Sequence, residues 1–328
     1  MMMMMEVLIS LLFIGVVVFV IFKFATADGD FTLISKGSAK WDEVENKVVW
    51  ITGASRGIGK ILADQFAGFG AKLILSARNV GELERVKDEI VSKHTSVLVE
   101  ILPLDLENGE DLLKQTVQKA ESFFSSAGVD YMVHNAAYDR PKSSAIEVPE
   151  EVLLRTFKVN VLGTITLTKV LAPFMLKRGR GHFIVMGSAA GKTPSPGQSV
   201  YSASKYALNG YFHTLRSDLC KKGIKVTIVC PGPISSTKVS VQSSSTEKRL
   251  TSERCSELII IAATHGLKEA WIANQPVLLV MYLVQYLPTL GYWVMDKVGA
   301  SRVEAAAEKG NTYSWKLIFG QKKKTHIK

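Results

Sequence analysis

A glycine-rich turn between an apolar run and an amphipathic run is the feature that constrains the fold most. The β-rich run Val48-Val-Trp-Ile-Thr52 breaks at Gly53, and a helical pattern follows from Ile58. Glycines let a backbone approach a pyrophosphate, and the amides at a helix N-terminus stabilise its charge. The pattern therefore predicts a strand, turn and helix that bind the phosphates of a dinucleotide. The turn residues expected to contact it are Gly53, Ser55, Arg56, Gly57, Ile58 and Gly59.

From residue 47 onward, short apolar runs alternate with longer amphipathic runs. This alternation predicts an α/β fold, a Rossmann-like doubly wound parallel sheet, because parallel strands need helical crossovers. We predict strands near 47–52, 72–77, 96–102, 129–134, 181–187, 224–230 and 269–273. We predict helices chiefly at 57–69, 80–93, 108–126, 150–177 and 198–222.

A second motif, Tyr201-Ser-Ala-Ser-Lys205, lies near the start of the last of these helices. The two side chains are four residues apart, so they share one helix face. A phenol loses its proton near pH ~10, and a neighbouring ammonium lowers that pKa because it favours the phenolate. The pair is therefore suited to proton transfer near neutral pH. Taken alone it is a weak signal, since most such pairs are half-exposed helix residues.

Ser188 follows the apolar run 183–186, which reads as a buried strand, and precedes a loop rich in Gly and Pro. Its hydroxyl would then lie at the carboxyl end of a strand beside the helix that carries Tyr201. A hydroxyl in that place can hold a carbonyl oxygen while the phenol protonates it.

These motifs, in this order, resemble those of the short-chain dehydrogenases/reductases. The resemblance covers residues 47–273 and includes the stretch Asn135-Ala-Ala and the pair Pro231-Gly232. The flanking segments 27–33 and 271–276 resemble one member of the family in particular.

The resemblance implies a catalytic tetrad of Asn160, Ser188, Tyr201 and Lys205. It implies that Tyr201 protonates the substrate oxygen and that Ser188 contacts the substrate by holding that oxygen. Lys205 would bind the nicotinamide ribose, and Asn160 would hold a water that relays protons through Lys205. Beyond the glycine turn, the cofactor contacts that it implies are Arg78, Asp105 near the adenine, Asn135, Tyr201, Lys205, Pro231, Gly232 and Ser236.

The implied activity is a reversible hydride transfer between a nicotinamide and lipophilic ketones or aldehydes of steroid, retinoid or xenobiotic type. The family also keeps a mobile substrate lid where the Ser/Thr-rich segment 235–251 lies, although such a polar run is equally typical of a plain flexible loop. The long helices before and after Tyr201 are where a homodimer would form by this resemblance.

The choice of cofactor follows from the charges at the end of the second strand. NAD enzymes place a carboxylate there for the ribose hydroxyls, whereas a 2′-phosphate needs a cation. Here the strand ends in Ser76-Ala77-Arg78 with no acid, and the glycine turn carries Arg56. Two guanidiniums can clamp a phosphate, so we predict NADPH/NADP+.

One stretch departs from the family pattern. The usual Asn-Asn-Ala-Gly reads His134-Asn135-Ala136-Ala137 here. The extra methyl of Ala137 stands where the backbone runs close to the cofactor, so it is expected to affect binding. His134 is expected to make a structural hydrogen bond and to take no part in catalysis.

The N-terminus carries an apolar run that is strongest over residues 7–22 and is closed by Lys23. With the preceding methionines it reaches the ~20 residues that span a bilayer. A cleaved secretory signal is the alternative, because Ala25-Thr-Ala27 has a small-x-small form. We favour a retained anchor, since no Lys or Arg precedes the run. By the family resemblance the anchor is expected in the endoplasmic reticulum membrane, with the side of the membrane left open. The domains expected are an anchor (1–24), a linker (25–46), a dinucleotide-binding catalytic domain (47–273) and a C-terminal extension (274–328).

The extension contains a second apolar tract, which begins at Pro276 and ends at Met295. Pro288 interrupts it and Gln285 lies inside it, which argues against a clean membrane span. It predicts a helix pair that either packs on the core or lies in the membrane interface.

Several function classes are disfavoured. The net charge of +10 is spread along the chain apart from three lysines at 322–324, so a nucleic-acid stripe is not expected. The three cysteines and six histidines show no disulfide or metal-ligand spacing. Two rivals to a reductase remain, a non-catalytic scaffold that binds through the same fold and an NAD-dependent epimerase or dehydratase. The intact tetrad argues against the first, and Arg78 argues against the second.

Overall fold

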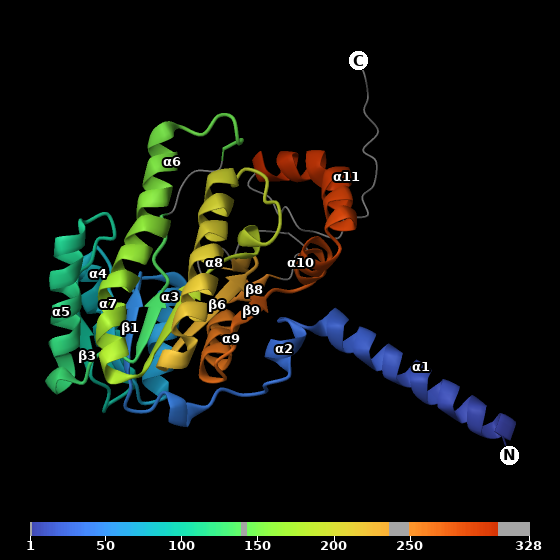
Figure 1. The fold of residues 1–328 in the computed structure, drawn as a ribbon, viewed down its shortest axis with the longest axis horizontal. Coiled ribbons are helices and arrows are strands. Elements are labelled where there is room, and N and C mark those ends of the chain that lie inside the picture. The colour runs from blue at the N-terminus through green and yellow to red at the C-terminus, as the bar shows by residue number, and fades with distance from the viewer. Residues whose placement is uncertain (1, 139–142, 236–248, 308–328) are drawn as a thin grey trace.

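The computed structural model describes residues 2–138, 143–235 and 249–307 (Figure 1). At its centre lies a seven-stranded parallel sheet of order β3-β2-β1-β4-β5-β6-β9. The predicted Rossmann-like, doubly wound fold is therefore confirmed. Each strand of this sheet overlaps one expected from the sequence: β1 (Val48–Thr52), β2 (Lys72–Ser76), β3 (Val99–Ile101), β4 (Tyr131–His134), β5 (Gly181–Met186), β6 (Ile224–Pro231) and β9 (Glu269–Ile272). A two-stranded pair that was not expected, β7 (Ile234–Ser235) and β8 (Leu250–Thr251), lies outside it.

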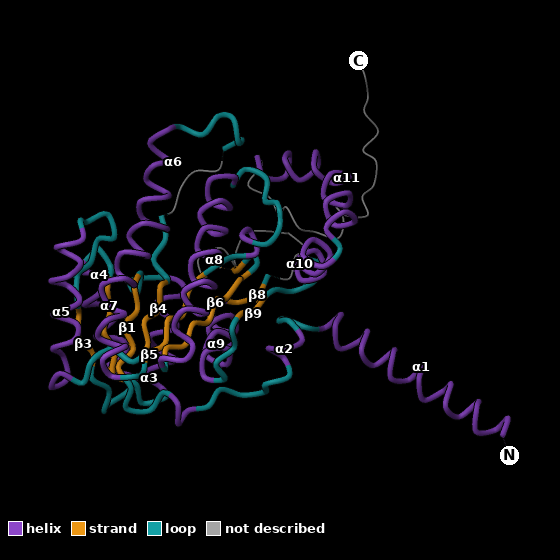
Figure 2. Tube along the Cα trace, in the orientation of Figure 1, coloured by secondary structure: helices purple, strands orange, loops and turns teal. Residues whose placement is uncertain are grey.

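Helices cover both faces of this sheet (Figure 2). One face is covered by α5 (Glu110–Ser126), α7 (Thr164–Arg178) and α8 (Ser199–Leu219), and the other by α3 (Gly57–Gly68), α4 (Val80–Lys93) and α9 (Ser252–Thr264). Successive side chains of β1 alternate between the two cores. Trp50 packs under the first set of helices, whereas Val49 and Ile51 pack under the second. All five β1 residues are buried, as expected for a central parallel strand.

The strand order reverses between β1 and β4. At such a switch point the loops after neighbouring strands diverge to opposite faces of the sheet, which leaves a crevice at the carboxyl ends. The glycine turn follows β1 and the stretch 135–137 follows β4, so both line this crevice.

The helix expected over 150–177 is continuous, but its hydrogen-bonding pattern changes from α to π and back. It consists of α6 (Glu150–Phe157), a π-helical stretch (Lys158–Gly163) and α7. A Cβ at Gly163 would lie 2.2 Å from the carbonyl oxygen of Leu106, so only glycine fits there. Such π-helical insertions occur frequently at functional sites, and this one contains Asn160.

The segment between the N-terminal helix and β1 is docked on the domain. It contains α2 (Phe31–Ile34) and a 3₁₀ turn (Trp41–Glu43). Gly29 forms an antiparallel bridge with Ile272, which covers the outer edge of β9. The buried Asp30 carboxylate accepts hydrogen bonds from the amides of Trp271 (2.6 Å) and Leu33 (3.0 Å). The segment 27–46, which lies within the expected linker, is therefore docked on the domain, and we call it the strap.

The C-terminal apolar tract forms a helix pair, α10 (Val277–Tyr286) and α11 (Pro288–Ala307). α11 begins at Pro288, where a proline is tolerated because the first turn needs no amide donor. Four inward side chains, Val280, Val284, Met295 and Val298, form a small core between the two helices.

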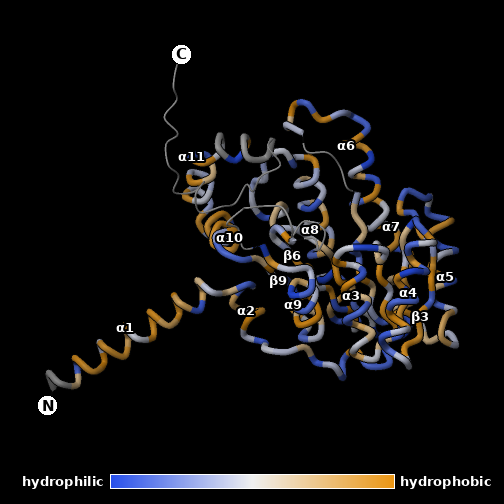
Figure 3. The backbone as a smooth tube through the Cα atoms, turned by 180° about the vertical axis from the view of Figure 1, so that it is seen from behind, coloured by the Kyte–Doolittle hydropathy of each residue, from blue (hydrophilic) through white to orange (hydrophobic). Residues whose placement is uncertain are grey.

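Helix α1 (Met2–Thr26) projects from the domain and is apolar along its length (Figures 1 and 3). Its 22-residue segment Met5–Thr26 has a mean hydropathy of 2.9, and none of its most apolar window is buried. That is long enough to cross a bilayer core, which needs about 20 residues. Another helical stretch, Glu150–Arg178, meets the same criteria of length and composition but is 56% buried, as a core helix would be.

Candidate active site

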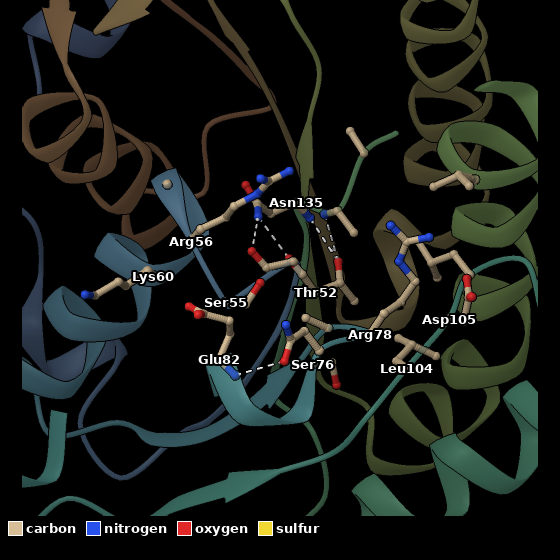
Figure 4. Close-up of a pocket in the computed structure, with 18 of the residues that line it drawn as sticks. Thr52, Ser55, Arg56, Lys60, Ser76, Arg78, Glu82, Leu104, Asp105 and Asn135 are labelled. Atoms are coloured by element: carbon tan, nitrogen blue, oxygen red, sulfur yellow. Dashed lines mark hydrogen bonds between the residues drawn. The ribbon is translucent and has the colours of Figure 1, made fainter. Parts of the chain in front are cut away.

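A cavity of about 990 Å³ opens at the carboxyl edge of the sheet beside the switch point (Figure 4). Its walls come from the glycine turn, the end of β2, the loop after β3 and the loop after β4. The predicted cofactor residues that line it are Gly53, Ser55, Arg56, Gly57, Ile58, Arg78, Asp105 and Asn135. The tetrad lies beyond its walls, so this cavity corresponds to the adenosine and phosphate end of a dinucleotide site.

The glycine turn has the geometry that the sequence pattern requires. Gly53 and Gly57 have φ values of +68° and +56°, which disfavour any residue with a Cβ. A Cβ on Gly59 would lie 2.3 Å from the carbonyl oxygen of Gly53. A Cβ on Gly57 would meet no atom within 4 Å, so the turn leaves open space at the start of α3. A pyrophosphate fits that space against the amides of the first helical turn.

Thr52 and Asn135 join the turn to the neighbouring strand β4. The Thr52 hydroxyl donates to the carbonyl of Val133 (3.1 Å) and accepts from the amides of Asn135 (3.1 Å) and Ala136 (3.2 Å). The Asn135 side chain donates in return to the carbonyls of Thr52 (3.0 Å) and Gly53 (3.2 Å). The Asn135 side chain thus fixes the backbone of the glycine turn, which is consistent with the expected position of Asn135 in the cofactor site.

Four cationic side chains line the cavity, and Figure 4 labels three of them, Arg56, Lys60 and Arg78. Lys60 and Arg85 line the cavity beside Arg56 and Arg78, but both pair with the carboxylate of Glu89. In the described part of the chain, the Arg78 guanidinium forms no ion pair. It is therefore available to an anion in the cavity.

An acid also lines this cavity, and the sequence reasoning missed it. Glu82 lies three residues beyond Asn79, whose side chain caps α4 by accepting from the Glu82 amide (3.1 Å). Its carboxylate pairs with Arg85 at 2.7 Å, so its charge is compensated. The i,i+3 spacing of Glu82 and Arg85 on a predicted helix could have indicated both.

Ser76 and Asp105 line the part of the cavity where the adenosine is expected. Ser76 at the end of β2 accepts a hydrogen bond from Trp50 (2.8 Å) and donates to the carbonyl of Leu102 (2.5 Å). Asp105 lines the cavity, and one of its oxygens accepts from the Glu107 amide (3.0 Å). This bond fixes the Asp105 carboxylate after β3, where an adenine was expected.

The departure from the family pattern has a structural explanation at His134. Its ring is buried between Phe183 and Phe212, and Nε2 is 2.8 Å from the Thr168 hydroxyl. Burial lowers the pKa of His134 to about 3, so the ring is neutral. The predicted structural hydrogen bond is confirmed. Ala137 lines the cavity with its methyl exposed, which agrees with its expected closeness to a bound cofactor.

Tyr201 and Lys205 lie on the face of α8 that meets the end of β5. The Lys205 ammonium is buried and donates to the carbonyl of Met186 at 2.6 Å. It lies 5.4 Å from the centroid of the Tyr201 ring. Because Met186 is the last residue of β5, this bond fixes the Tyr201/Lys205 face against the segment that carries Ser188.

Ser188 caps a short 3₁₀ turn after β5, since its hydroxyl accepts from the amide of Ala190 (3.1 Å). The loop then packs directly on α8. A Cβ on Gly191 would lie 3.0 Å from Cβ of Lys205, and Asn209 donates to the Gly191 carbonyl (2.9 Å). Ser188, Tyr201 and Lys205 are therefore assembled around one strand end, as the sequence predicts.

Asn160 also lies near Tyr201, and Ser204 links the two residues. Its side-chain oxygen accepts from the amide of Tyr138 (2.8 Å), and its nitrogen contacts the Ser204 hydroxyl (3.2 Å). Ser204 donates in turn to the carbonyl of Tyr201 (2.7 Å). The Asn160 side chain thus reaches the Tyr201 turn by way of Ser204, a link that the sequence did not reveal.

A half-buried ionic group behind the loop was also missed. Glu269 on β9 accepts from Lys192 (2.9 Å) and lies 2.6 Å from Nε2 of His213, with the indole of Trp271 on its other oxygen. Burial raises the pKa of Glu269, but its polar contacts have the larger combined effect and lower the pKa to about 2. These contacts are the hydrogen bond with His213, the charge of Lys192, and the hydrogen bonds from Trp271 and Lys192. The carboxylate therefore joins the loop, α8 and β9.

The last predicted cofactor residues follow β6. Pro231 ends this strand, and the Gly232 amide donates to the carbonyl of Ile272 (2.8 Å). A Cβ on Gly232 would lie 2.9 Å from Cβ of Ala273, so glycine is required for the strand ends to approach. Ser236 and residues 236–248 of the expected lid lie outside the described residues.

Comparisons with known proteins agree with this geometry. A family model described as short chain dehydrogenase matches residues 47–248. Dehydrogenase/reductase SDR family member 7 of Homo sapiens is 37% identical over 304 residues, which cover 86% of this chain and 87% of that protein. It is the family member that the segments 27–33 and 271–276 resemble, so that prediction is confirmed.

Solved structures share the fold. A metagenomic short-chain oxidoreductase in complex with NADP aligns with a TM-score of 0.58 and 26% identity, covering 68% of this chain and 92% of that one. A short chain dehydrogenase from Shigella flexneri 2a, complexed with NADP, aligns with a TM-score of 0.61 and 25% identity over 69% and 93% of the two chains.

Proposed function

Since the chain belongs to the short-chain dehydrogenase/reductase family and is an oxidoreductase, we propose that it is an NADPH-dependent carbonyl reductase. Its substrates in this proposal are lipophilic ketones or aldehydes of steroid, retinoid or xenobiotic type. The observation that carries the proposal is the bond from Lys205 to the Met186 carbonyl, because it brings Tyr201 and Ser188 to one strand end.

The cavity supports NADP(H) as the cofactor. The open space at Gly57 suits the pyrophosphate, and the Arg78 guanidinium suits a 2′-phosphate at the end of β2. The Glu82 carboxylate does not oppose this choice, because its partner Arg85 compensates its charge. Two related structures are complexes with NADP, which supports the same choice.

In the proposed mechanism, bound NADPH supplies a hydride for the carbonyl carbon of the substrate. The Ser188 hydroxyl donates a hydrogen bond to the carbonyl oxygen and holds it beside α8. The Tyr201 phenol gives its proton to that oxygen, which completes the alcohol. The Lys205 ammonium keeps two donors beyond its bond to Met186, for the nicotinamide ribose and for the charge that develops on Tyr201.

For Asn160 we propose a supporting role. Its side chain already accepts from the Tyr138 amide and donates to Ser204, so we place the proton-relaying water at its backbone within the π-helical stretch. A π-helical stretch leaves carbonyls without their usual i+4 partners, which makes them available to water.

We also propose that α1 anchors the enzyme in the endoplasmic reticulum membrane. Its length, its hydropathy and its lack of buried surface support an anchor. Lipophilic carbonyl compounds partition into membranes, so an anchored domain meets its substrates at high local concentration. A homodimer is part of the proposal, because α6, α8 and the π-helical stretch expose Leu154, Leu162 and Tyr206.

The test is turnover by purified full-length protein in detergent with NADPH and a panel of steroids, retinoids, aldehydes and a small diketone. We expect NADPH oxidation with the lipophilic carbonyls and far slower oxidation with NADH. If NADPH binds but no carbonyl on the panel is reduced, the reductase proposal fails and a non-catalytic binding role takes its place.

A further inference from the structure

The α10–α11 pair has one face that packs and one that does not. Val280, Val284, Met295 and Val298 are nearly inaccessible between the helices. The side chains at the outer turn have 46–69% of their surface exposed. We call these residues the apolar elbow: Tyr286, Leu287, Leu290, Tyr292 and Trp293. The helix pair therefore packs its inner face in a core, as one of the two expected arrangements requires, and leaves its outer face uncovered.

The elbow is held outward by close packing. A Cβ on Gly291 would lie 2.6 Å from Cα of Val284, so the first turn of α11 rests on the backbone of α10. The buried Arg302 guanidinium donates to the carbonyl of Pro194 (2.8 Å), which fixes α11 on the loop after β5. With the inner face filled in this way, the elbow side chains have no room to turn inward.

The composition of the tract suits a lipid surface more than water. Residues 275–295 contain no Asp, Glu, Lys or Arg. Tyrosine and tryptophan are enriched where a membrane meets water, because their rings are apolar at one end and polar at the other. The first charges after the tract are Asp296 and Lys297, and the Lys297 ammonium lies 5.5 Å from the Trp293 ring centroid. A cation beside a tryptophan is common at the level of lipid headgroups.

The elbow is continuous with the end of the anchor. The Phe24 ring in the last turn of α1 is 5.6 Å from Tyr282 of α10, and Gln275 donates to the Phe24 carbonyl (2.9 Å). Tyr282 stacks on Tyr286 at 5.9 Å, so ring contacts lead from the anchor to the elbow. α1, α10 and α11 lie on the same flank of the molecule in both views (Figures 1 and 3).

We propose that the apolar elbow is a second membrane contact, whose occupant is the surface of the same bilayer that α1 crosses. Leu287, Leu290 and Trp293 enter the boundary between headgroups and acyl chains, and Tyr286 and Tyr292 lie at headgroup level. The inference rests on the anchor proposed above and is independent of the reaction. Two contacts set the orientation of the domain on the membrane, since one helix alone leaves it free to rotate.

The test uses full-length protein reconstituted into vesicles of phosphatidylcholine brominated near the headgroup end of the acyl chain. Only protein that floats with the vesicles is measured. Bromine quenches tryptophan emission at contact distance, so Trp293 should contribute most of the quenching. Trp293→Phe should lose most of it, whereas Trp41→Phe, which removes an exposed tryptophan near the β1 end of the strap, should retain it.

Equal quenching in wild type and Trp293→Phe would overturn the inference, as would be found if a second copy of the chain covered the elbow. The double change Leu287→Glu/Leu290→Glu provides a second measurement, because carboxylates at these positions should lift Trp293 from the bilayer and reduce its quenching. Unchanged quenching in this variant would also count against the contact. Protein that fails to float would instead refute the anchor of the proposed function, and protein that floats but turns over no carbonyl would refute only the reaction.

Discussion

Gln285 on α10 donates a hydrogen bond to the backbone carbonyl of Lys192 at 2.6 Å. Lys192 lies on the loop between Ser188 and Tyr201, so the C-terminal extension contacts the loop that joins two residues of the candidate site. Arg302 of α11 makes a second such contact at Pro194. The extension therefore supports the loop that presents the proposed catalytic hydroxyl.

Gln285→Leu should lower turnover without preventing folding. The change leaves the Lys192 carbonyl without its donor, which costs about 1–3 kcal/mol of stability. A slightly displaced Ser188 should reduce kcat on the order of 10-fold, since a displacement near 1 Å can cost about 10². Gln275→Leu is the matched control, because Gln275 lies just before the same helix but contacts Phe24 and Leu279. Equal kcat losses in the two variants would argue that the helix acts only through stability.

Glu269 should make stability depend on acid pH. Its folded pKa of about 2 is below the value of an unfolded glutamate, so the ionised group stabilises the fold above about pH 4.5. This contribution is lost as the pH falls through about 2. Its size is on the order of 2–3 kcal/mol after allowance for partial solvent screening.

Urea unfolding from pH 6 to pH 2 compares wild type with Glu269→Gln. The wild type should be more stable near neutrality, and the difference should shrink as the pH falls. A difference that stays constant over this range would mean that the Glu269 charge does not hold Lys192 and His213.

The fold was largely predictable because each strand is a short apolar run between glycine or polar turns. β1 and β5 are buried along nearly their whole length, so their sequences carry the signal directly. The π-helical stretch was not predictable, because its cause is the close approach of Gly163 to the Leu106 carbonyl, a contact between distant segments. The docking of Gly29 on Ile272 is likewise a tertiary pairing that leaves no periodic pattern.

Tyr201→Phe should abolish carbonyl reduction and preserve cofactor binding. The substitution keeps the ring beneath Lys205 and removes only the hydroxyl. Loss of a general acid costs on the order of 10²–10⁴ in rate. Steady-state kinetics and NADPH fluorescence titration measure the two effects separately. Near-normal turnover in this variant would show that another group protonates the substrate.

Arg56→Ala/Arg78→Ala should weaken NADPH binding far more than NADH binding. Each charge-assisted contact to a 2′-phosphate is worth roughly 1.5–3 kcal/mol. Lys60→Ala is the comparison, since Lys60 lines the same cavity but pairs with Glu89. Equal losses for both cofactors in the double variant would contradict a phosphate clamp at Arg78.

The site could be predicted where the chemistry depends on residue types at fixed spacing. The glycine turn and the Tyr201/Lys205 pair are of this kind, and the structure gives both the expected local geometry. Glu269 could not be found in this way, because its partners Lys192 and His213 come from distant parts of the chain. Only the sheet order, which places β9 beside β6, brings them together.

The N-terminal helix should be retained in the mature protein. The segment Ala25-Thr-Ala27 that resembles a cleavage site ends a helix, and the Ala27 side chain is buried. Asp28, the residue after the cleavage position, pairs with Arg254 at 2.7 Å. Cleavage after Ala27 would remove the Phe24 contacts with Gln275 and Tyr282, which attach the anchor to α10.

Full-length protein should therefore sediment with membranes, resist extraction by alkaline carbonate and begin upstream of Ala27 on N-terminal sequencing. A helix of Met5–Thr26 with no buried apolar window gains enough from transfer into lipid to survive carbonate, which strips proteins held by charge alone. The elbow adds only an interfacial contact, so a variant lacking residues 1–24 should leave carbonate-washed membranes yet still bind vesicles weakly. A mature N-terminus at Asp28 would identify a cleaved signal. Among the described segments, membrane attachment would then rest on the elbow, because no other described helix combines spanning length with an unburied apolar surface.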